Sequence, residues 1–333
     1  MTATMKAVRL YRYGGPEVLQ IEDVPVPQPQ AGEVLVKVAA SGVNYADTMR
    51  RWNRYPEPTP LPYTLGGEVA GTVEALGEGV GTVSVGTSVL AAMPAGGGYA
   101  QYVTVPAGHL IPLPPQLDPV RATAVLVQGL SAHLLLKASA RLQSGESVLV
   151  QAAAGGVGIL AVQLAKRIGA GRVIAAASSS AKLELARSLG ADAGVNYMHD
   201  DWPQQVLDAN GGRGVDVILE MVGGTVFERN FDCLAPFGRV VVFGLASGQP
   251  TSLDPQRLLG QCQSIVGFYL GQFFAQPGLI QSSLGELMEE ITTGRLTLHV
   301  GQVFPLSKVA EAHRLLEDRQ TTGKVVLQPW ADT

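Results

Sequence analysis

The feature that most constrains this chain is a glycine-rich turn between an apolar strand and a helix. Within Ser147-Val-Leu-Val-Gln-Ala-Ala-Ala-Gly-Gly-Val-Gly158, three small residues take the spacing of a G-x-G-x-x-G pattern, with alanine in the first place. Such a turn lets the backbone touch a pyrophosphate at a helix N-terminus, where free N–H groups favour anions. A tight turn without a ligand is the alternative. We expect dinucleotide binding by the whole turn: Ala153, Gly155, Gly156, Val157 and Gly158.

This turn opens a regular alternation of apolar strands and helices. Short continuous apolar strands separated by helices are typical of a parallel sheet that is covered on both faces. Six strands suit a doubly wound, Rossmann-type α/β fold. The predicted strands are Ser147–Gln151, Val173–Ala177, Ala193–Asn196, Val215–Glu220, Arg239–Phe243 and Ser264–Tyr269.

The first 125 or so residues have a different pattern of short strands broken by Gly and Pro. This pattern predicts a β-barrel-like domain. After about residue 268 the chain becomes helical and ends on a strand-like Lys324–Gln328, a stretch too short for a separate domain. We therefore expect a dinucleotide-binding domain over residues 126–267, and a barrel domain over residues 1–125 to which residues 268–333 return.

The end of the second Rossmann strand indicates which dinucleotide binds. NAD-binding proteins place an Asp or Glu there for the ribose 2′-OH. Here the segment reads Ala175-Ala-Ala-Ser-Ser-Ser-Ala-Lys182, without a carboxylate. The hydroxyls, Ser178 among them, leave room for a 2′-phosphate, and Lys182 supplies positive charge. The pattern favours NADPH; a solvated Lys182 at the start of a helix is the alternative.

Composition excludes several other classes of protein. The net charge of −4 provides no basic surface for nucleic acid, and no apolar stretch of membrane-spanning length is free of Gly, Pro or polar residues. The first ten residues lack a signal-peptide pattern. The two cysteines, Cys233 and Cys262, form no C-x-x-C pair, and two buried thiols in a reducing compartment are expected. We expect a cytoplasmic protein.

The barrel-like part, the Rossmann pattern and the returning tail together resemble the medium-chain dehydrogenase/reductase superfamily. This resemblance implies a GroES-like β-barrel domain beside the Rossmann domain. Zinc-dependent members carry a Cys in a G-x-C-H-x-D turn and a His in a G-H-E motif. Here Asn44 stands in place of the Cys, in Gly42-Val-Asn-Tyr-Ala-Asp47, and Gly67 in place of the His. No Cys precedes Cys233, so the four-cysteine zinc lobe is missing as well, and we expect no catalytic metal.

The G-x-N-x-x-D turn, the A-A-x-G-G-V-G loop and the S-x-x-K segment resemble the quinone oxidoreductase branch, which includes the zeta-crystallins. The resemblance implies that Asn44 lies beside the nicotinamide and the reacting carbonyl, and that Tyr55 belongs to the substrate pocket. The resemblance implies three further sets of cofactor contacts. Ser131 supplies a hydroxyl. Lys182, Tyr197 and Arg319 lie around the adenosine phosphate, and the loop of Phe243, Gly244 and Leu245 crosses the nicotinamide.

The implied activity is NADPH-dependent hydride transfer to a quinone without zinc. Asn44 would donate a hydrogen bond to the developing oxyanion, and the proton would come from solvent. Met49 replaces a tyrosine of some relatives, which suits a more apolar pocket and leaves a 2-alkenal or enone reductase as one alternative. A non-catalytic NADPH-binding protein is the other. The apolar strand Ser264–Leu270 could pair across an exposed sheet edge in a homodimer.

Several polar residues of the barrel domain have simpler interpretations. Asn44 could only cap a turn. Asp47 and Glu68 look like an acid pair, but we expect them to brace the barrel and orient their neighbours. Arg50, Arg51 and Arg54 are expected in a solvated loop.

Overall fold

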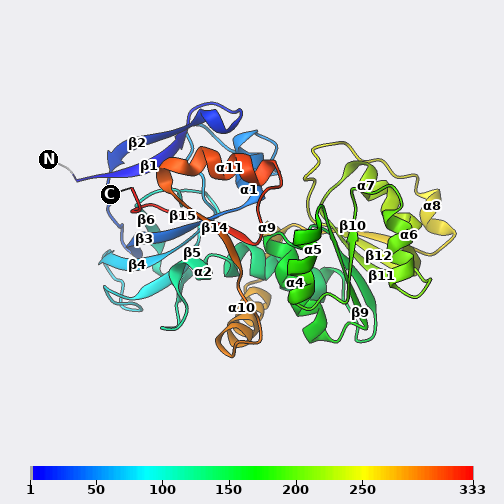
Figure 1. The fold of residues 1–333 in the computed structure, drawn as a ribbon. Coiled ribbons are helices and arrows are strands. Elements are labelled where there is room, and N and C mark those ends of the chain that lie inside the picture. Colours follow the sequence, from blue (N-terminus) through cyan, green and yellow to red (C-terminus); the bar gives the residue numbers. More distant parts are fainter. Residues whose placement is uncertain (1–2, 333) are drawn as a thin grey trace. The chain divides into compact units, whose positions relative to one another are not determined.

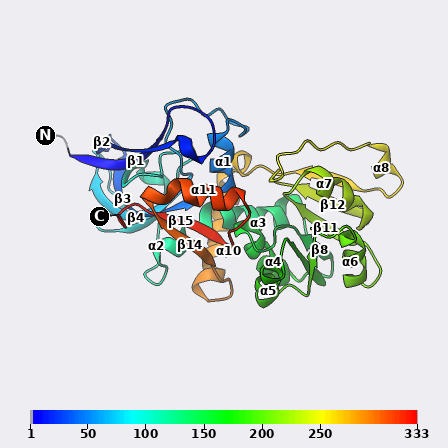
Figure 2. The ribbon, with the colours of Figure 1, turned by 45° about the horizontal axis from the view of Figure 1, so that its top comes forward.

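Two units make up the structure, a computed structural model that describes residues 3–332. Unit 1 comprises Met1–Val127 and Leu298–Thr333, and unit 2 comprises Gln128–Thr297. The colours of Figure 1 separate them along the chain: unit 1 takes the blue and cyan start and the red end, and unit 2 the green to orange middle. Figure 2 shows the same ribbon turned by 45°.

Unit 1 is built on a seven-stranded sheet and a two-stranded hairpin. The sheet has the order β14-β15-β3-β4-β5-β7, with β6 also paired to β3, and β1 pairs with β2. Its strands are β1 (Thr4–Leu10), β2 (Leu19–Pro25), β3 (Glu33–Val43), β4 (Glu68–Leu76), β5 (Ser88–Ala92), β6 (Tyr102–Pro106), β7 (Leu110–Pro112), β14 (Val300–Pro305) and β15 (Lys324–Gln328). Its helices are α1 (Tyr45–Arg51), α2 (Pro119–Ala122) and α11 (Val309–Glu317).

The strand register of unit 1 determines which residues meet. β3 is central, because it pairs with β4, with β6 and with β15. Val325 lies opposite Val43, and Val69 lies opposite Ser41, so the starts of β15 and β4 both lie beside the end of β3. The interior is filled by small branched residues that alternate along the strands, such as Val34, Val36 and Val38.

Unit 2 contains a six-stranded parallel sheet. Its order is β10-β9-β8-β11-β12-β13, which in chain order is 3-2-1-4-5-6, the doubly wound arrangement predicted from the sequence. The strands are β8 (Ser147–Val150), β9 (Arg172–Ala177), β10 (Ala193–Asn196), β11 (Val215–Glu220), β12 (Leu234–Val242) and β13 (Ser264–Gly267). The helices are α3 (Leu130–Leu134), α4 (Gly156–Ile168), α5 (Ser180–Ser188), α6 (Trp202–Ala209), α7 (Gly224–Arg229), α8 (Gln256–Leu259), α9 (Leu270–Phe273) and α10 (Pro277–Thr292).

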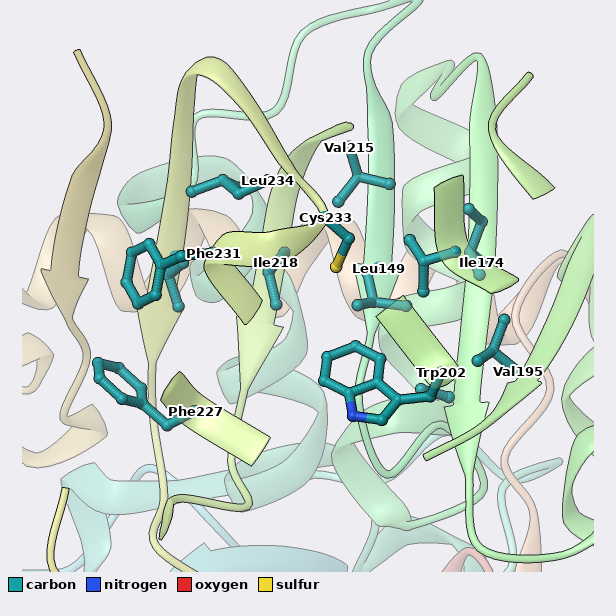
Figure 3. Packing of buried hydrophobic residues seen from close by; sticks show 13 residues of the cluster. Leu149, Ile174, Val195, Trp202, Val215, Ile218, Phe227, Phe231, Cys233 and Leu234 are labelled. Atoms are coloured by element: carbon teal, nitrogen blue, oxygen red, sulfur yellow. The ribbon is translucent and has the colours of Figure 1, made fainter. Parts of the chain in front are cut away.

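One face of this sheet packs against large side chains of the helices. Trp202 of α6 and Phe227 of α7 cover Leu149, Ile218 and other strand residues (Figure 3). Trp202 is only 2% exposed. Burial of rings of this size supplies much of the hydrophobic free energy of a core. The core therefore holds β8 and β11 together close to the point where the strand order reverses, which is where such sheets bind ligands.

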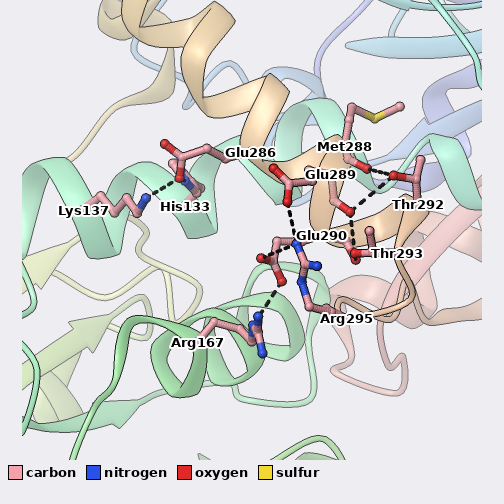
Figure 4. Close-up of polar contacts among 10 residues, drawn as sticks. All are labelled: His133, Lys137, Arg167, Glu286, Met288, Glu289, Glu290, Thr292, Thr293 and Arg295. Atoms are coloured by element: carbon pink, nitrogen blue, oxygen red, sulfur yellow. Dashed lines mark hydrogen bonds and ion pairs between the residues drawn. The ribbon is translucent and has the colours of Figure 1, made fainter.

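The extent of the first unit differs from the sequence prediction. We expected all of residues 268–333 to return to the barrel domain, but residues 268–297 belong to unit 2. Helix α10 packs on α3 of unit 2, where Glu286 lies 3.1 Å from His133 and also bonds Lys137 (Figure 4). Periodicity predicts that this helix exists, but it does not say which partner its faces meet.

The segment Pro119–Ser139 is the one described helix that is long and apolar enough to cross a membrane. It is mostly buried inside the protein, as the core helix of a soluble protein would be. It contains two π-helical stretches, Val125–Gly129 and Leu135–Ser139, on either side of α3. Single π-turns of this kind often lie at functional sites.

The two thiols differ in exposure. Cys233 is buried, and burial raises its pKa to about 12. Cys262 is exposed, so the expectation that both thiols are buried is wrong for this residue. It follows α8 in a turn with a positive φ of 52°, outside the strands that would bury it.

Candidate active site

The glycine-rich turn lies between β8 and α4. Gly155 is the residue before the first turn of α4, and no side chain caps that helix, so its first N–H groups remain available. A Cβ on Gly158 would collide with the backbone of Ala152 and Ala153. A Cβ on Gly156 would collide with the side-chain amide of Gln128. Glycine at both positions is thus required by the close packing of the turn against its own chain, which is the packing role of the last glycine in such a pattern.

The residues predicted to contact the adenosine phosphate in unit 2 lie near one another along the sheet edge. Ser178 follows β9, and Ser179 caps α5 by accepting a hydrogen bond from the backbone N–H of Lys182 at 3.4 Å. Tyr197 follows β10, the neighbour of β9, and its N–H donates to the carbonyl of Ala177 at 3.3 Å. No carboxylate occurs in residues 172–183. Ser178, Lys182 and Tyr197 therefore share one edge.

A third loop of unit 2 ends β12 at the same edge of the sheet. The N–H of Phe243 donates to the carbonyl of Glu220 at 2.9 Å, which joins the ends of β12 and β11. Gly244 approaches Met221 closely, and Leu245 is 43% exposed. Because carboxyl ends of parallel strands meet at one edge, Phe243, Gly244 and Leu245 lie at the edge that carries the glycine turn.

Two further polar side chains of unit 2 precede the glycine turn in the chain. Ser131, in α3, is 6% exposed. Gln128 was not predicted from the sequence; it is 8% exposed, its amide lies against Gly156, and its buried Oε1 has no hydrogen-bond partner. Gln128 directly precedes the Gly-Leu-Ser131 segment, but neither its residue type nor its spacing predicts that it contacts the glycine turn.

In unit 1, Asn44 is the residue between β3 and α1 and is 7% exposed. Its Nδ2 donates to Glu68 Oε1 at 2.9 Å, and its Oδ1 accepts from Lys324 Nζ at 2.9 Å. Lys324 also bonds Glu68, and both of these charged side chains are completely buried. Asn44 thus stands at the start of a helix, but its side chain also belongs to a buried polar centre.

Asp47 braces the same junction. It accepts hydrogen bonds from the N–H of Asn44 at 2.9 Å, from the N–H of Gly66 at 3.2 Å and from the hydroxyl of Tyr99 at 3.0 Å. Burial raises the pKa of Asp47 despite these donors, and burial together with Asp47 raises the pKa of Tyr99 well above its usual value. These contacts agree with the bracing role expected for Asp47 and Glu68.

The arginines near α1 do not all lie in a solvated loop, as we had expected. Arg51 is completely buried: it bonds both carboxylate oxygens of Glu317 at 2.6 and 2.7 Å and lies 2.9 Å from Nδ1 of His313. Helices α1 and α11 are in contact, which joins residues more than 260 positions apart in the chain. The run of basic residues in the sequence does not predict that Arg51 is buried.

The remaining predicted residues of unit 1 lie outside this centre. Tyr55 is half-buried, and the guanidinium of Arg50 stacks over its ring at 4.1 Å. Arg319 is exposed, in the turn after α11, with a positive φ of 58°. Asn44, Tyr55 and Arg319 belong to unit 1, whereas the other predicted cofactor contacts belong to unit 2.

Among residues 3–332, no three His, Cys, Asp or Glu side chains are grouped so that they could hold a metal ion. Asn44, which stands at the cysteine position of the zinc-dependent motif, accepts a hydrogen bond from Lys324 Nζ at 2.9 Å. An ammonium group, which only donates hydrogen bonds, is a poor neighbour for a cation.

The chain matches two family models: alcohol dehydrogenase GroES-like domain over residues 30–115, and zinc-binding dehydrogenase over residues 156–291. Among its relatives, a quinone oxidoreductase of Pseudomonas aeruginosa is 37% identical over 97% of this chain and 99% of its own length. A 2-haloacrylate reductase of a Burkholderia species is 34% identical over 98% of this chain and 99% of its own length.

Solved structures give the same result for the fold. The Escherichia coli quinone oxidoreductase complexed with NADPH matches with a TM-score of 0.91 at 32% identity, over 97% of this chain and 100% of that one. The Thermus thermophilus quinone oxidoreductase, also described with its NADPH complex, matches with a TM-score of 0.85 at 40% identity, over 97% and 100%. Because these relatives are 32% to 40% identical over almost their whole length, the chain belongs to the quinone oxidoreductase family of the medium-chain dehydrogenase/reductase superfamily.

Proposed function

We propose that the protein is an NADPH-dependent reductase that transfers a hydride to a quinone without zinc. The observation that carries the proposal is the glycine turn at the start of α4, followed at the end of β9 by serines and a lysine with no carboxylate. A carboxylate there would bond a ribose 2′-OH, whereas hydroxyls and a cation suit a 2′-phosphate. Relatives described with NADPH add support.

The residues of unit 2 fit such a cofactor. Gly156 and Gly158 leave no room for a side chain, and the free N–H groups of α4 are suited to a pyrophosphate. Ser178, Lys182 and Tyr197 would hold the adenosine end, with Arg319 of unit 1. Ser131 and the loop of Phe243, Gly244 and Leu245 would hold the nicotinamide end.

When bound, NADPH supplies the hydride, and the chain supplies position and polarity. The side-chain N–H of Asn44 donates a hydrogen bond to the acceptor oxygen as negative charge develops there. Such a bond is worth about 3 kcal/mol in good geometry. Tyr55 lines the acceptor side. Asp47 is buried among three donors, and Glu68 bonds Lys324, Asn44 and the N–H of Val127. Since neither carboxyl is free to donate a proton, solvent supplies the proton to the product.

Oxidation of NADPH, followed by its absorbance, tests the proposal with 1,4-benzoquinone and 9,10-phenanthrenequinone as acceptors. Turnover with NADPH, much slower turnover with NADH and no effect of EDTA are expected. Turnover that EDTA abolishes would contradict a zinc-free enzyme. Tight NADPH binding without turnover of any acceptor would instead favour a non-catalytic NADPH-binding protein.

A second candidate is reduction of an activated alkene, such as a 2-alkenal or an enone. The relative called 2-haloacrylate reductase and the apolar Met49 near Asn44 in the sequence favour it. The same hydride assay with an enone and a 2-alkenal distinguishes the two, because turnover of these acceptors alone would assign the chain to alkene reduction.

We further propose a cytoplasmic homodimer in which β13 pairs with its copy. β13 is the last strand of the six-stranded sheet, and Ile265 in it is 37% exposed. An unpaired strand edge with exposed apolar residues favours association. Sedimentation of the protein tests this arrangement, since Ile265→Lys should shift it to monomer.

A further inference from the structure

We propose that Lys324 and Glu68 act as positioning residues that make Asn44 offer an N–H, and not its oxygen, to the acceptor. The inference rests on the proposed function, in which Asn44 contacts the acceptor. It assigns a role in that step to Lys324, a residue that lies 280 positions away in the chain.

The contacts fix the orientation of the Asn44 amide. Lys324 Nζ can only donate a hydrogen bond, so the Asn44 atom 2.9 Å from it must be the amide oxygen. A carboxylate can only accept, so the Asn44 atom 2.9 Å from Glu68 Oε1 must be the nitrogen. The amide oxygen and one N–H are therefore engaged, and the second N–H is the group left for a ligand.

Glu68 is itself held in place. Its Oε2 accepts from the backbone N–H of Val127 at 2.9 Å, and its Oε1 is shared by Lys324 and Asn44. Lys324 and Glu68 are both completely buried, and together they carry no net charge. A buried ion pair is weak support for stability but is suited to fixing one geometry. The ammonium on the amide oxygen also polarises the amide and strengthens its N–H as a donor.

The strand register builds this arrangement. Val325 lies opposite Val43, which places Lys324 beside Asn44, and Val69 lies opposite Ser41, which places Glu68 near Gly42. A Cβ on Gly42 would collide with the side chains of both Glu68 and Lys324. Gly42 therefore provides the space in which the pair reaches Asn44.

The test removes both charges together in Lys324→Met/Glu68→Gln, because a single change would leave a buried charge unpaired. We expect kcat with duroquinone to fall at least tenfold while the NADPH dissociation constant stays within twofold. The matched control is Arg239→Met/Glu146→Gln, which removes an ion pair of unit 2 between β12 and the residue before β8, and should leave kcat within twofold. Lys324→Arg keeps the donor and should retain kcat within threefold.

Nuclear magnetic resonance of ¹⁵N-asparagine protein tests the amide orientation without turnover, and the chain has only five asparagines. In the wild type, the two Asn44 Nδ2 protons should be well separated, because one bonds a carboxylate. Only the other should shift when NADP⁺ and duroquinone, which do not react together, are added. Shifts of neither proton, or of both equally, would overturn the inference even if the double variant does not fold.

Asn44→Ala separates this inference from the proposed function. If Asn44→Ala lowers kcat but the folded Lys324→Met/Glu68→Gln variant keeps the wild-type value, only the positioning role is overturned. If Asn44→Ala keeps the wild-type kcat, Asn44 has no part in hydride transfer, and both the proposed role of Asn44 and its positioning are overturned.

Discussion

The glycine turn of unit 2 and the Asn44 centre of unit 1 are built in opposite ways. The turn is one continuous segment, uncharged, and defined by the side chains it lacks at Gly156 and Gly158. The Asn44 centre joins three segments, at residues 44, 68 and 324, and holds two buried charges. A contiguous backbone site can be recognised in a sequence, whereas a centre assembled by strand register cannot.

The two sites should also fail differently. Charge is what makes the Asn44 centre vulnerable, so Lys324→Met alone, which leaves Glu68 buried and unpaired, should lower the free energy of unfolding by about 3–5 kcal/mol. Urea unfolding checks this value. The Lys324→Met/Glu68→Gln variant should lose much less, and an equal loss in both would mean that an unpaired Glu68 charge is not the cause.

Space is what makes the glycine turn vulnerable. In Gly158→Ala the added Cβ meets the backbone of Ala152, so we expect a loss of about 3 kcal/mol and NADPH binding weakened about 100-fold. Calorimetric titration with NADPH measures the second effect. The control is Gly285→Ala, in a part of α10 where an added Cβ meets no other atom. This change should raise the free energy of unfolding by up to about 1 kcal/mol. Unchanged NADPH affinity in Gly158→Ala would show that the turn does not approach the cofactor.

The folding stability of unit 1 should be more sensitive to acid than that of unit 2 because of His313. Burial, and then the charge of Arg51, lower the pKa of this histidine from its usual 6.5 to about 3, so the unfolded chain binds the proton first. Stability is therefore lost as the pH falls below about 6.5, by about 2 kcal/mol from pH 7 to pH 5. Because burial raises the pKa of Asp47, this carboxyl acts in the opposite direction.

Urea unfolding at pH 7 and pH 5 measures this loss, with His313→Gln as the comparison. Gln does not titrate, so the loss should shrink by about 2 kcal/mol in that variant. A pH dependence that is the same in both proteins would mean that folding does not lower the pKa of His313.

The smallest expected effect concerns the choice of cofactor in unit 2. Lys182→Ala should reduce kcat/KM for NADPH about tenfold, which corresponds to about 1.4 kcal/mol. The value of kcat/KM for NADH should stay unchanged. Steady-state rates with both cofactors check this ratio. An equal fall for both would place Lys182 away from the 2′-phosphate, as a helix residue without that role.

The sequence predicted unit 2 well because its information is local. Each strand of the Rossmann sheet is a short apolar segment, and the glycine turn is a single segment, so periodicity and spacing were sufficient. The alternation of strands and helices predicts a parallel, doubly wound sheet, and the order 3-2-1-4-5-6 is one of the orders that such sheets adopt. The location of α10 was predicted wrongly, because a helical pattern does not identify the partner on which the helix packs.

Long-range pairing explains what the sequence did not reveal. Asn44 was found by its resemblance to the family, but Lys324 has only an apolar strand after it as context. It joins Asn44 because β15 pairs with β3, a contact between segments near the two ends of the chain. Arg51 was placed in a solvated loop for the same reason, since its partners His313 and Glu317 lie on α11.

We propose that unit 2 holds NADPH while Asn44 of unit 1 assists hydride transfer to a quinone. A single-turnover measurement with enzyme-bound NADPH and duroquinone, in wild type and Asn44→Ala, tests it most directly. We expect the wild type to oxidise NADPH, and Asn44→Ala to slow this oxidation at least tenfold with NADPH affinity unchanged. Equal rates in the two proteins, or no oxidation in the wild type, would contradict it.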